Sequence, residues 1–209
     1  MSGARLSIHA SFLALASLLV PSSARADETS KWGLGFVPAF RVGRAWATVE
    51  ASNGDKPSQA GWALEVDGTG VLTLPGDRFA LGVAVGYLDA FLSYTDGAKN
   101  LGLGYSGLTV TPTVMVALFS RLFVQGRVGW LDGSWSPGNT AFDKAALRYG
   151  GGVSAYVYRN AGADLVLQLD VLRTDAGSVD FGTYQGRIAG TTASLGVAFT
   201  FFGPNDFTF

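Results

Sequence analysis

The sequence predicts an all-β fold, an eight-stranded antiparallel up-and-down transmembrane β-barrel. Eight segments carry an apolar residue at every second position, which is the period of a strand and not of a helix. The connections between these segments alternate between short and long. Each segment also has at least the roughly 9 to 11 residues that a tilted strand needs to cross a bilayer.

The amino terminus predicts an export signal over residues 1–26. Arg5 supplies a positive start, an apolar run extends from Ser11 to Val20, and Ala24-Arg25-Ala26 forms a small-residue cleavage site. The apolar run is shorter than the roughly 18 to 20 residues of a membrane-spanning helix, although a retained anchor is the alternative. Residues 27–209 are expected to form one barrel domain, because no linker or change of composition divides them.

The first four expected strands are 31–49, 61–74, 79–94 and 106–119. Their outward faces are marked in the first by Leu34, Phe36, Pro38, Phe40 and Val42, in the second by Leu64, Val66, Leu72 and Leu74, in the third by Phe79, Leu81, Val83, Val85 and Tyr87, and in the fourth by Leu108, Val110, Pro112, Val114, Val116 and Leu118. Pro38 and Pro112 lack an amide hydrogen, so each is expected at a bulge or a weakly paired position.

The last four expected strands are 122–131, 145–158, 163–174 and 191–202. Their outward faces are marked in order by Leu122, Val124, Val128 and Trp130, by Leu147, Tyr149, Val153 and Val157, by Leu165, Leu167, Leu169 and Val171, and by Ala193, Leu195, Val197, Phe199 and Phe201. Charged residues fall on the other face. A strand with one apolar and one polar face fits a barrel wall better than a strand buried on both sides.

The connections predict which rim faces which compartment. Residues 75–78, 120–121 and 159–162 are tight turns, whereas 50–60, 95–105, 132–144 and 175–190 are long and rich in Gly, Asp, Asn and Ser. Short periplasmic turns and long external loops are the pattern of outer-membrane barrels. The chain contains no cysteine, so burial and strand pairing must stabilise it without disulfides.

Aromatic residues gather near the expected strand ends. Their amphipathic rings favour the headgroup zone of a membrane, which predicts aromatic girdles. The alternative is the aromatic core of a soluble β-sandwich. The expected girdle residues are Trp32, Trp46, Trp62, Phe79, Tyr87, Trp130, Tyr149, Phe199 and Phe201.

The signal, the eight strands and the terminal aromatics together resemble the small outer-membrane barrels typified by the OmpA membrane domain and OmpX. The aromatic end of the last strand, 197–202, is similar to the segment that barrel-assembly machinery reads in such proteins, although 203–206 separate it from Phe207 and Phe209. The resemblance implies a location in the cell outer membrane, with outer-membrane lipid, lipopolysaccharide and the assembly machinery as partners. After removal of the signal, 13 basic and 16 acidic residues remain, so no nucleic-acid partner is expected.

The inward faces are expected to hold a balanced set of charges. An eight-stranded bore is just wide enough to be filled by side chains, and an unpaired charge there is strongly disfavoured. We therefore expect an ion-paired plug; a gated conduit, whose ion pairs exchange partners, is the alternative. The expected lumen network is Arg41, Glu65, Asp67, Arg127, Arg148 and Asp170.

The sequence offers little for catalysis. The only histidine, His9, lies in the expected signal, whereas the lipid A deacylases, palmitoyltransferases, phospholipases and surface proteases that resemble this architecture use a histidine base. Lys31, Lys56, Lys99 and Lys144 are expected at rims or in loops. We therefore expect no enzyme.

Three further patterns are not expected to form sites. Glu65 and Asp67 lie about 6.6 Å apart along one strand face, a glycosidase-like spacing, but ion pairing explains them better. The glycines of 102–107 match a dinucleotide motif by letter only, because they open a strand instead of a helix. The acidic loop residues Asp132, Asp143, Asp175 and Asp180 fit no cation-binding signature. Neither a cofactor nor a metal is expected.

The leading functional prediction is a non-enzymatic barrel that contributes to envelope structure or surface interaction through four external loops. The loop residues proposed to contact an unknown surface partner or lipopolysaccharide phosphate are Trp135, Phe142, Phe181, Tyr184 and Arg187. One alternative is a small channel or transporter of small or apolar solutes, with a lateral opening near 150–152 and Pro112. Another is a secreted, lipocalin-like barrel whose apolar face points inward.

Overall fold

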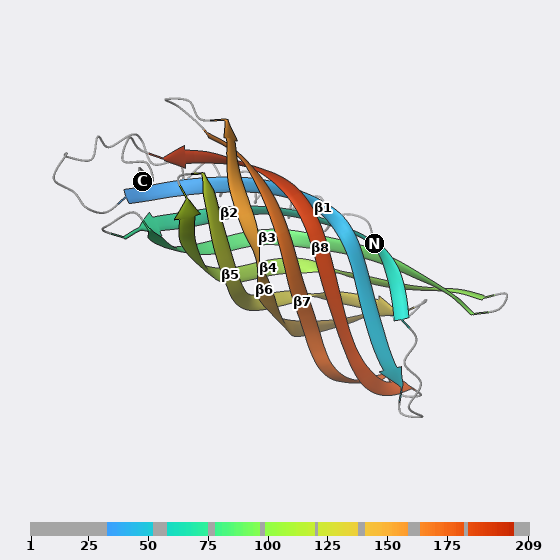
Figure 1. Cartoon of the computed structure of the whole chain (residues 1–209). Coiled ribbons are helices and arrows are strands. Elements are labelled where there is room, and N and C mark those ends of the chain that lie inside the picture. Colours follow the sequence, from blue (N-terminus) through green and yellow to red (C-terminus); the bar gives the residue numbers. More distant parts are fainter. Residues whose placement is uncertain are drawn as a thin grey trace, which may run out of the picture.

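The computed structural model describes residues 33–51, 58–74, 78–96, 99–119, 121–137, 141–158, 164–181 and 184–202. The described residues form eight strands: β1 (Gly33–Ala51), β2 (Ser58–Thr73), β3 (Phe79–Asp96), β4 (Lys99–Phe119), β5 (Leu122–Pro137), β6 (Phe142–Tyr158), β7 (Asp164–Phe181) and β8 (Tyr184–Phe202). Each strand pairs antiparallel with the next, and β8 pairs with β1, which closes the barrel (Figure 1). The predicted fold class is therefore confirmed. In the described ranges, no helix is long and apolar enough to cross a membrane.

Several predicted features lie outside the described residues. They are the expected signal over 1–26, the girdle residue Trp32, Lys31 and Lys56, and the segment after Phe202.

The two faces of the wall divide as the alternation predicts. Leucine, valine and aromatic side chains on the outside are mostly 40–70% exposed, whereas the inward charged side chains are buried. The alternating leucine, valine and aromatic side chains point outward, whereas a lipocalin-like barrel requires this set to point inward. The secreted-barrel alternative is therefore wrong in its central assumption.

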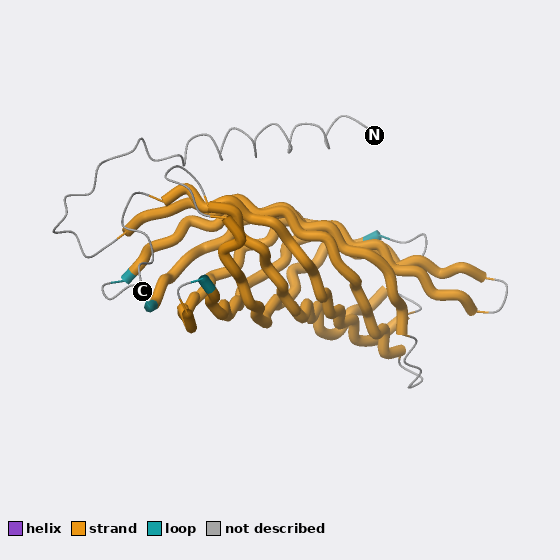
Figure 2. The backbone as a smooth tube through the Cα atoms, turned by 45° about the horizontal axis from the view of Figure 1, so that its top comes forward, coloured by secondary structure: helices purple, strands orange, loops and turns teal. Residues whose placement is uncertain are grey.

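The predicted strand ends at the long-loop side are wrong. All four hairpins there continue as paired strands of 16 to 21 residues, and β3 and β4 project furthest (Figure 2). Trp135, Phe142, Phe181, Tyr184 and Arg187, expected in loops, all lie in strands. Backbone pairing between two adjacent antiparallel strands does not require apolar side chains, so Gly, Asp and Ser content alone did not mark where pairing ends.

Local irregularities follow the residues that cause them. Pairing of β1 with β8 lapses at Pro38, and pairing of β4 with β5 lapses at Pro112, as a missing amide hydrogen predicts. The register of β7 with β8 shifts between Asp175 and Gly177, where Gly177 adopts a φ of 67° that favours glycine. Residues 150–152 pair without interruption on both sides, so they form no lateral opening in the described wall.

Candidate functional site

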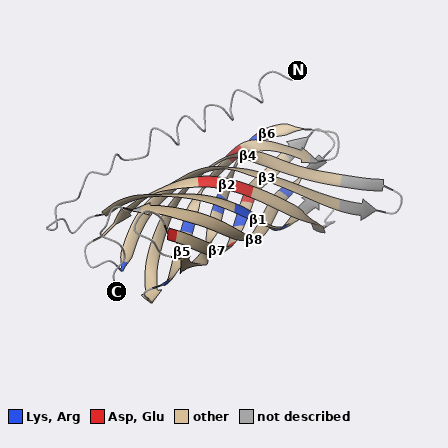
Figure 3. Ribbon diagram, turned by 90° about the horizontal axis from the view of Figure 1, so that it is seen from above, with Lys and Arg blue, Asp and Glu red and all other residues tan. Residues whose placement is uncertain are grey.

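Six charged side chains from five strands meet at mid-length in the lumen. Figure 3 shows blue and red ribbon segments gathered in the middle of the barrel. Each of the six side chains is at most 4% exposed, although each lies on a strand whose opposite face is exposed. They are Arg41 on β1, Glu65 and Asp67 on β2, Arg127 on β5, Arg148 on β6 and Asp170 on β7.

Arg41 connects all three carboxylates. Its Nη1 donates to Asp67 and lies 3.7 Å from Oε2 of Glu65, while its Nε lies 2.9 Å from Oδ2 of Asp170. The guanidinium also donates to Oε1 of Gln168 at 3.0 and 3.2 Å. Arg41 is therefore the centre of the network.

Arg127 contacts two carboxylates from the opposite wall of the lumen. Its Nη1 donates to Oδ2 of Asp67 at 3.4 Å, and its Nη2 lies 4.0 Å from Oδ2 of Asp170. Gln125 joins this pair, because its Oε1 accepts from Arg127 at 3.4 Å and its Nε2 donates to Asp170 at 2.6 Å. The network thus includes two amides: Gln125 bridges Arg127 and Asp170, and Gln168 accepts from Arg41.

Arg148 completes the charge balance through Glu65. Its Nη2 donates to Oε2 of Glu65 at 2.7 Å, while Nε and Nη1, both buried, have no protein partner. Three arginines therefore face three carboxylates, so the network as a whole carries no net charge. Buried pairs of this kind tolerate ionised groups only when the partners stay in place.

Three glycines that sequence reasoning missed lie directly opposite network residues. Gly86 pairs with Asp67, Gly152 with Asp170, and Gly196 with Arg41. A Cβ atom at Gly86 would stand 2.5 Å from Cβ of Asp67, and one at Gly196 would stand 2.5 Å from Cγ of Arg41. At Gly152 it would overlap Oδ1 of Asp170. The glycines provide the space in which the charged side chains lie across the neighbouring strand. The pattern that could have identified these glycines is an inward-facing glycine directly opposite a charged residue. That pattern can be recognised only when the register of the paired strands is known.

The lumen beyond the network, toward the long hairpins, is filled by an apolar cluster. The rings of Tyr105 and Trp135 stack there with centroids 4.8 Å apart, and Trp135 donates from Nε1 to the carbonyl oxygen of Lys144 at 3.1 Å. Trp135 is fully buried, so its predicted place in an exposed loop is wrong. We name this group the upper cluster; it comprises Ala45, Ala47, Ala63, Leu88, Ala90, Leu92, Leu103, Tyr105, Leu131, Trp135, Ala146, Ala176, Val179 and Ile188.

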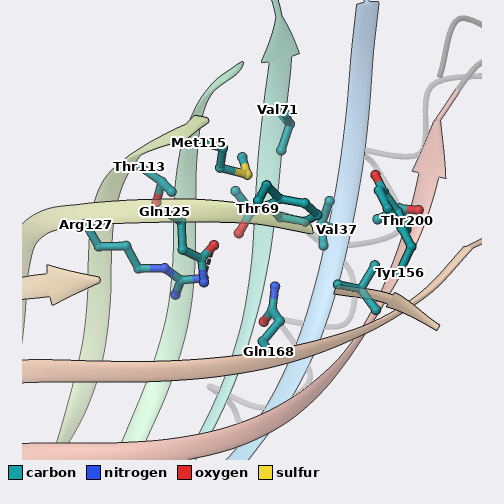
Figure 4. A pocket seen from close by; sticks show the side chains of 12 residues that line it. Val37, Thr69, Val71, Thr113, Met115, Gln125, Arg127, Tyr156, Gln168 and Thr200 are labelled. Atoms are coloured by element: carbon teal, nitrogen blue, oxygen red, sulfur yellow. Dashed lines mark hydrogen bonds between the residues drawn. The ribbon is translucent and has the colours of Figure 1, made fainter. Parts of the chain in front are cut away.

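The lumen toward the short turns holds a smaller apolar cluster around a narrow cavity. Met115, Tyr156 and Val37 line this cavity, and Gln125, Arg127 and Gln168 approach it from the network (Figure 4). Its volume of about 20 Å³ has room for about one water molecule. We name the apolar group the lower cluster; it comprises Val37, Ala39, Val71, Ala80, Met115, Tyr156, Val166 and Ala198.

The described girdle residues all point outward. Trp62 is 61% exposed, and the guanidinium of Arg44 lies 5.5 Å from the centroid of its indole ring, within cation–π range. The other exposed girdle residues are Trp46, Phe79, Tyr87, Trp130, Tyr149, Phe199 and Phe201.

The remaining chemical candidates are used structurally. Glu65 and Asp67 are both engaged by arginines, and the glycine motif of 102–107 lies within β4. Lys144, expected in a loop, lies in β6, where its Nζ donates to the carbonyl oxygen of Ser178. Within the described part of the chain, no cluster of three His, Cys, Asp or Glu side chains is arranged to hold a metal ion.

Comparison with known proteins identifies the fold. No protein-family model and no curated protein sequence matches this chain. Among solved structures, Neisserial surface protein A matches with a TM-score of 0.50 at 18% identity, over 81% of this chain and 96% of that one. Ail of Yersinia pestis matches at 0.46 and 15% identity, over 81% and 99% of the two chains. The outer membrane protease OmpT of Escherichia coli matches at 0.41 and 10%, over 84% and 99%. The chain has the architecture of the small outer-membrane barrels.

Replacement of Arg41 by methionine should destabilise the barrel strongly. The substitution leaves buried carboxylates without their shared partner, so we expect the free energy of unfolding to fall by about 3–5 kcal/mol. Urea titration in detergent micelles, followed by tryptophan fluorescence, measures this change. The control is Arg173→Met on the outer face, expected within about 0.5 kcal/mol of the parent. Equal losses in both variants would contradict a special role for Arg41.

Gly152→Ala should lower stability by about 1–3 kcal/mol, because the added methyl group would overlap Asp170. Gly126→Ala is the matched control on β5, since a Cβ atom there would meet nothing within 4 Å. The same urea titration compares the two midpoints. If the control loses as much as Gly152→Ala, strand propensity and not the network determines the effect.

Proposed function

We propose that this chain is a non-enzymatic integral β-barrel of the outer membrane with a closed lumen, serving envelope structure or surface interaction. The observation that carries the proposal is the contrast between the two faces of the wall. The outer face is an apolar belt and the inner face is a neutral, paired network between two apolar clusters.

The belt supports a place in a bilayer. Soluble monomers rarely expose contiguous apolar patches of more than a few hundred Å². Here leucine, valine and aromatic side chains are exposed on every strand, for example Leu34, Phe91, Val128 and Leu195. A closed barrel also leaves no unpaired strand edge, which a strand-built membrane span requires. Lipid is therefore the proposed surrounding of the belt.

Three successive barriers support a closed lumen. The lower cluster leaves about 20 Å³, the network joins opposite walls through Arg41 and Arg127, and the upper cluster stacks Tyr105 on Trp135. An ion must lose its hydration to pass apolar packing as tight as this. The closed lumen is thus supported by packing at both ends and not by the ion pairs alone.

The outer face near the long hairpins supports contact with lipopolysaccharide. Arg44, Arg173 and Arg187 are exposed there and fit the phosphate groups of such a lipid. Arg187 also donates to Asp175 on the neighbouring strand. At the other end, Phe199 and Phe201 of β8 are exposed and available to barrel-assembly machinery.

A second candidate function is a gated conduit for small solutes. Buried donors on Arg127 and Arg148 have no protein partner, which leaves sites where water can bind beside the network. Exchange of partners among the arginines would connect such waters. This candidate requires that the two apolar clusters also open.

Planar-bilayer recordings separate the two candidates. We expect the purified barrel to be silent, and Arg127→Ala to remain silent because both clusters still close the lumen. Arg127→Ala combined with Tyr105→Ala, Trp135→Ala, Met115→Ala and Tyr156→Ala should conduct, because this variant reduces the network and both clusters. Steady, charge-selective conductance of the unmodified protein, altered by Arg127→Ala alone, would favour the conduit.

Gel mobility tests the membrane barrel itself. We expect membrane-extracted protein to migrate differently before and after boiling, because an intact barrel resists detergent until heat unfolds it. The protein should also need detergent to stay in solution. Full solubility of the folded chain without detergent would contradict the proposed location.

A further inference from the structure

An open apolar groove crosses the outer wall on β1, β2 and β3, near the short turns. These strands lie side by side in Figure 1. The groove has a volume of about 500 Å³, and no charged or polar side chain lines it. It is lined by Leu34, Gly35, Phe36, Gly70, Val71, Leu72, Leu81, Gly82 and Val83.

The groove exists because one outward position lacks a side chain. Gly70 lies between Phe36 on β1 and Val83 on β3, and a Cβ atom at Gly70 would meet nothing within 4 Å. Phe36 does not cover this space. Its ring lies over Gly68 instead, where an added Cβ atom would stand 2.7 Å from Cζ of the ring. The hollow over Gly70 thus remains open between apolar neighbours.

We propose that this groove binds one acyl chain of a phospholipid in the periplasmic leaflet. The inference rests on the proposed membrane location. The groove lies within the apolar belt, so hydrocarbon is what surrounds it in a bilayer. A flexible acyl chain can enter the hollow that the missing side chain of Gly70 leaves. A wall without such a hollow offers no equivalent site.

The size of the groove favours a chain over a second copy of the protein. It extends across three strands, which is about 10 Å between β1 and β3, and over the rows of Leu72 and Gly70. A stable protein interface covers about 800 Å² on each partner. The groove alone is much smaller than that.

An exposed cation lies at the rim of the barrel just before β3, beyond the end of the groove that faces the short turns. Arg78 is exposed just before β3, three residues from Leu81, or about 10 Å along the chain. Its backbone position is fixed, since its carbonyl oxygen accepts from the amide of Ala117 at 2.9 Å. A lipid whose chain lies over Gly70 would place its headgroup toward this rim, where Arg78 can pair with the phosphate.

Native mass spectrometry of barrels extracted in mild detergent tests the proposal. Dioleoylphosphatidylglycerol is the added probe, and retained lipids are counted per barrel. We expect each parent barrel to retain one lipid molecule. Gly70→Leu should bind this lipid at least about tenfold more weakly, because the leucine displaces two or more methylene groups of the acyl chain from the groove. Gly126→Leu is the matched control, as Gly126 is another outward glycine with nothing within 4 Å of an added Cβ atom, and it should bind like the parent.

Two further variants sharpen the test. Gly70→Ala fills less of the groove and should weaken binding by less than Gly70→Leu. Arg78→Gln should weaken binding of phosphatidylglycerol but leave binding of dioleoylglycerol, which lacks phosphate, unchanged. Cold and boiled gel mobility verifies that each variant is folded.

The outcomes separate this inference from the proposed function. Equal lipid retention by folded Gly70→Leu and Gly126→Leu overturns the groove proposal and leaves the membrane barrel in place. The groove proposal is also overturned if the parent forms a lipid-free dimer and Gly70→Leu dissociates this dimer. The groove would then bind a second copy of the protein. A parent protein that is soluble without detergent and carries no lipid overturns both.

Discussion

The narrow bore of an eight-stranded barrel sets the conditions for everything inside it. There is no room for a hydrated ion beside each charge, so arginines and carboxylates must neutralise one another by direct contact. Arg41 does this for three carboxylates at once, which makes the charges of three strands interdependent. A network of this kind fixes which strands stand opposite one another across the lumen, and not only which are neighbours.

The network depends on what surrounds it. Long side chains lie across the neighbouring strand only because Gly86, Gly152 and Gly196 leave space there. The upper and lower clusters place apolar side chains on both sides of the network, and such low-polarity surroundings strengthen each ion pair in the middle. The proposed closure of the lumen and the stability of the barrel therefore depend on one arrangement.

The outward-facing positions alternate with the inward-facing ones along each strand, so glycines also occur on the outer wall. The inward glycines leave space that protein side chains occupy. The outward Gly70 leaves an open hollow on the outer wall, which no side chain of the protein fills. Gly68, two residues away, is covered by Phe36 and leaves no such space. The identity of the residue is the same at both positions, so the neighbouring strand decides whether a glycine is a covered site or an open one.

The sequence by itself determined the strand number, the turn order and the face on which side chains of the predicted strands lie, because a period of two depends only on consecutive residues. It therefore identified Arg41, Glu65, Asp67, Arg127, Arg148 and Asp170 as inward residues. It did not determine where the hairpins end, that Trp135 stacks on Tyr105, or which glycines stand opposite charges or beside Phe36. These features depend on register and on contacts across the lumen between residues far apart in the chain, and only the closed tertiary structure brings such residues together.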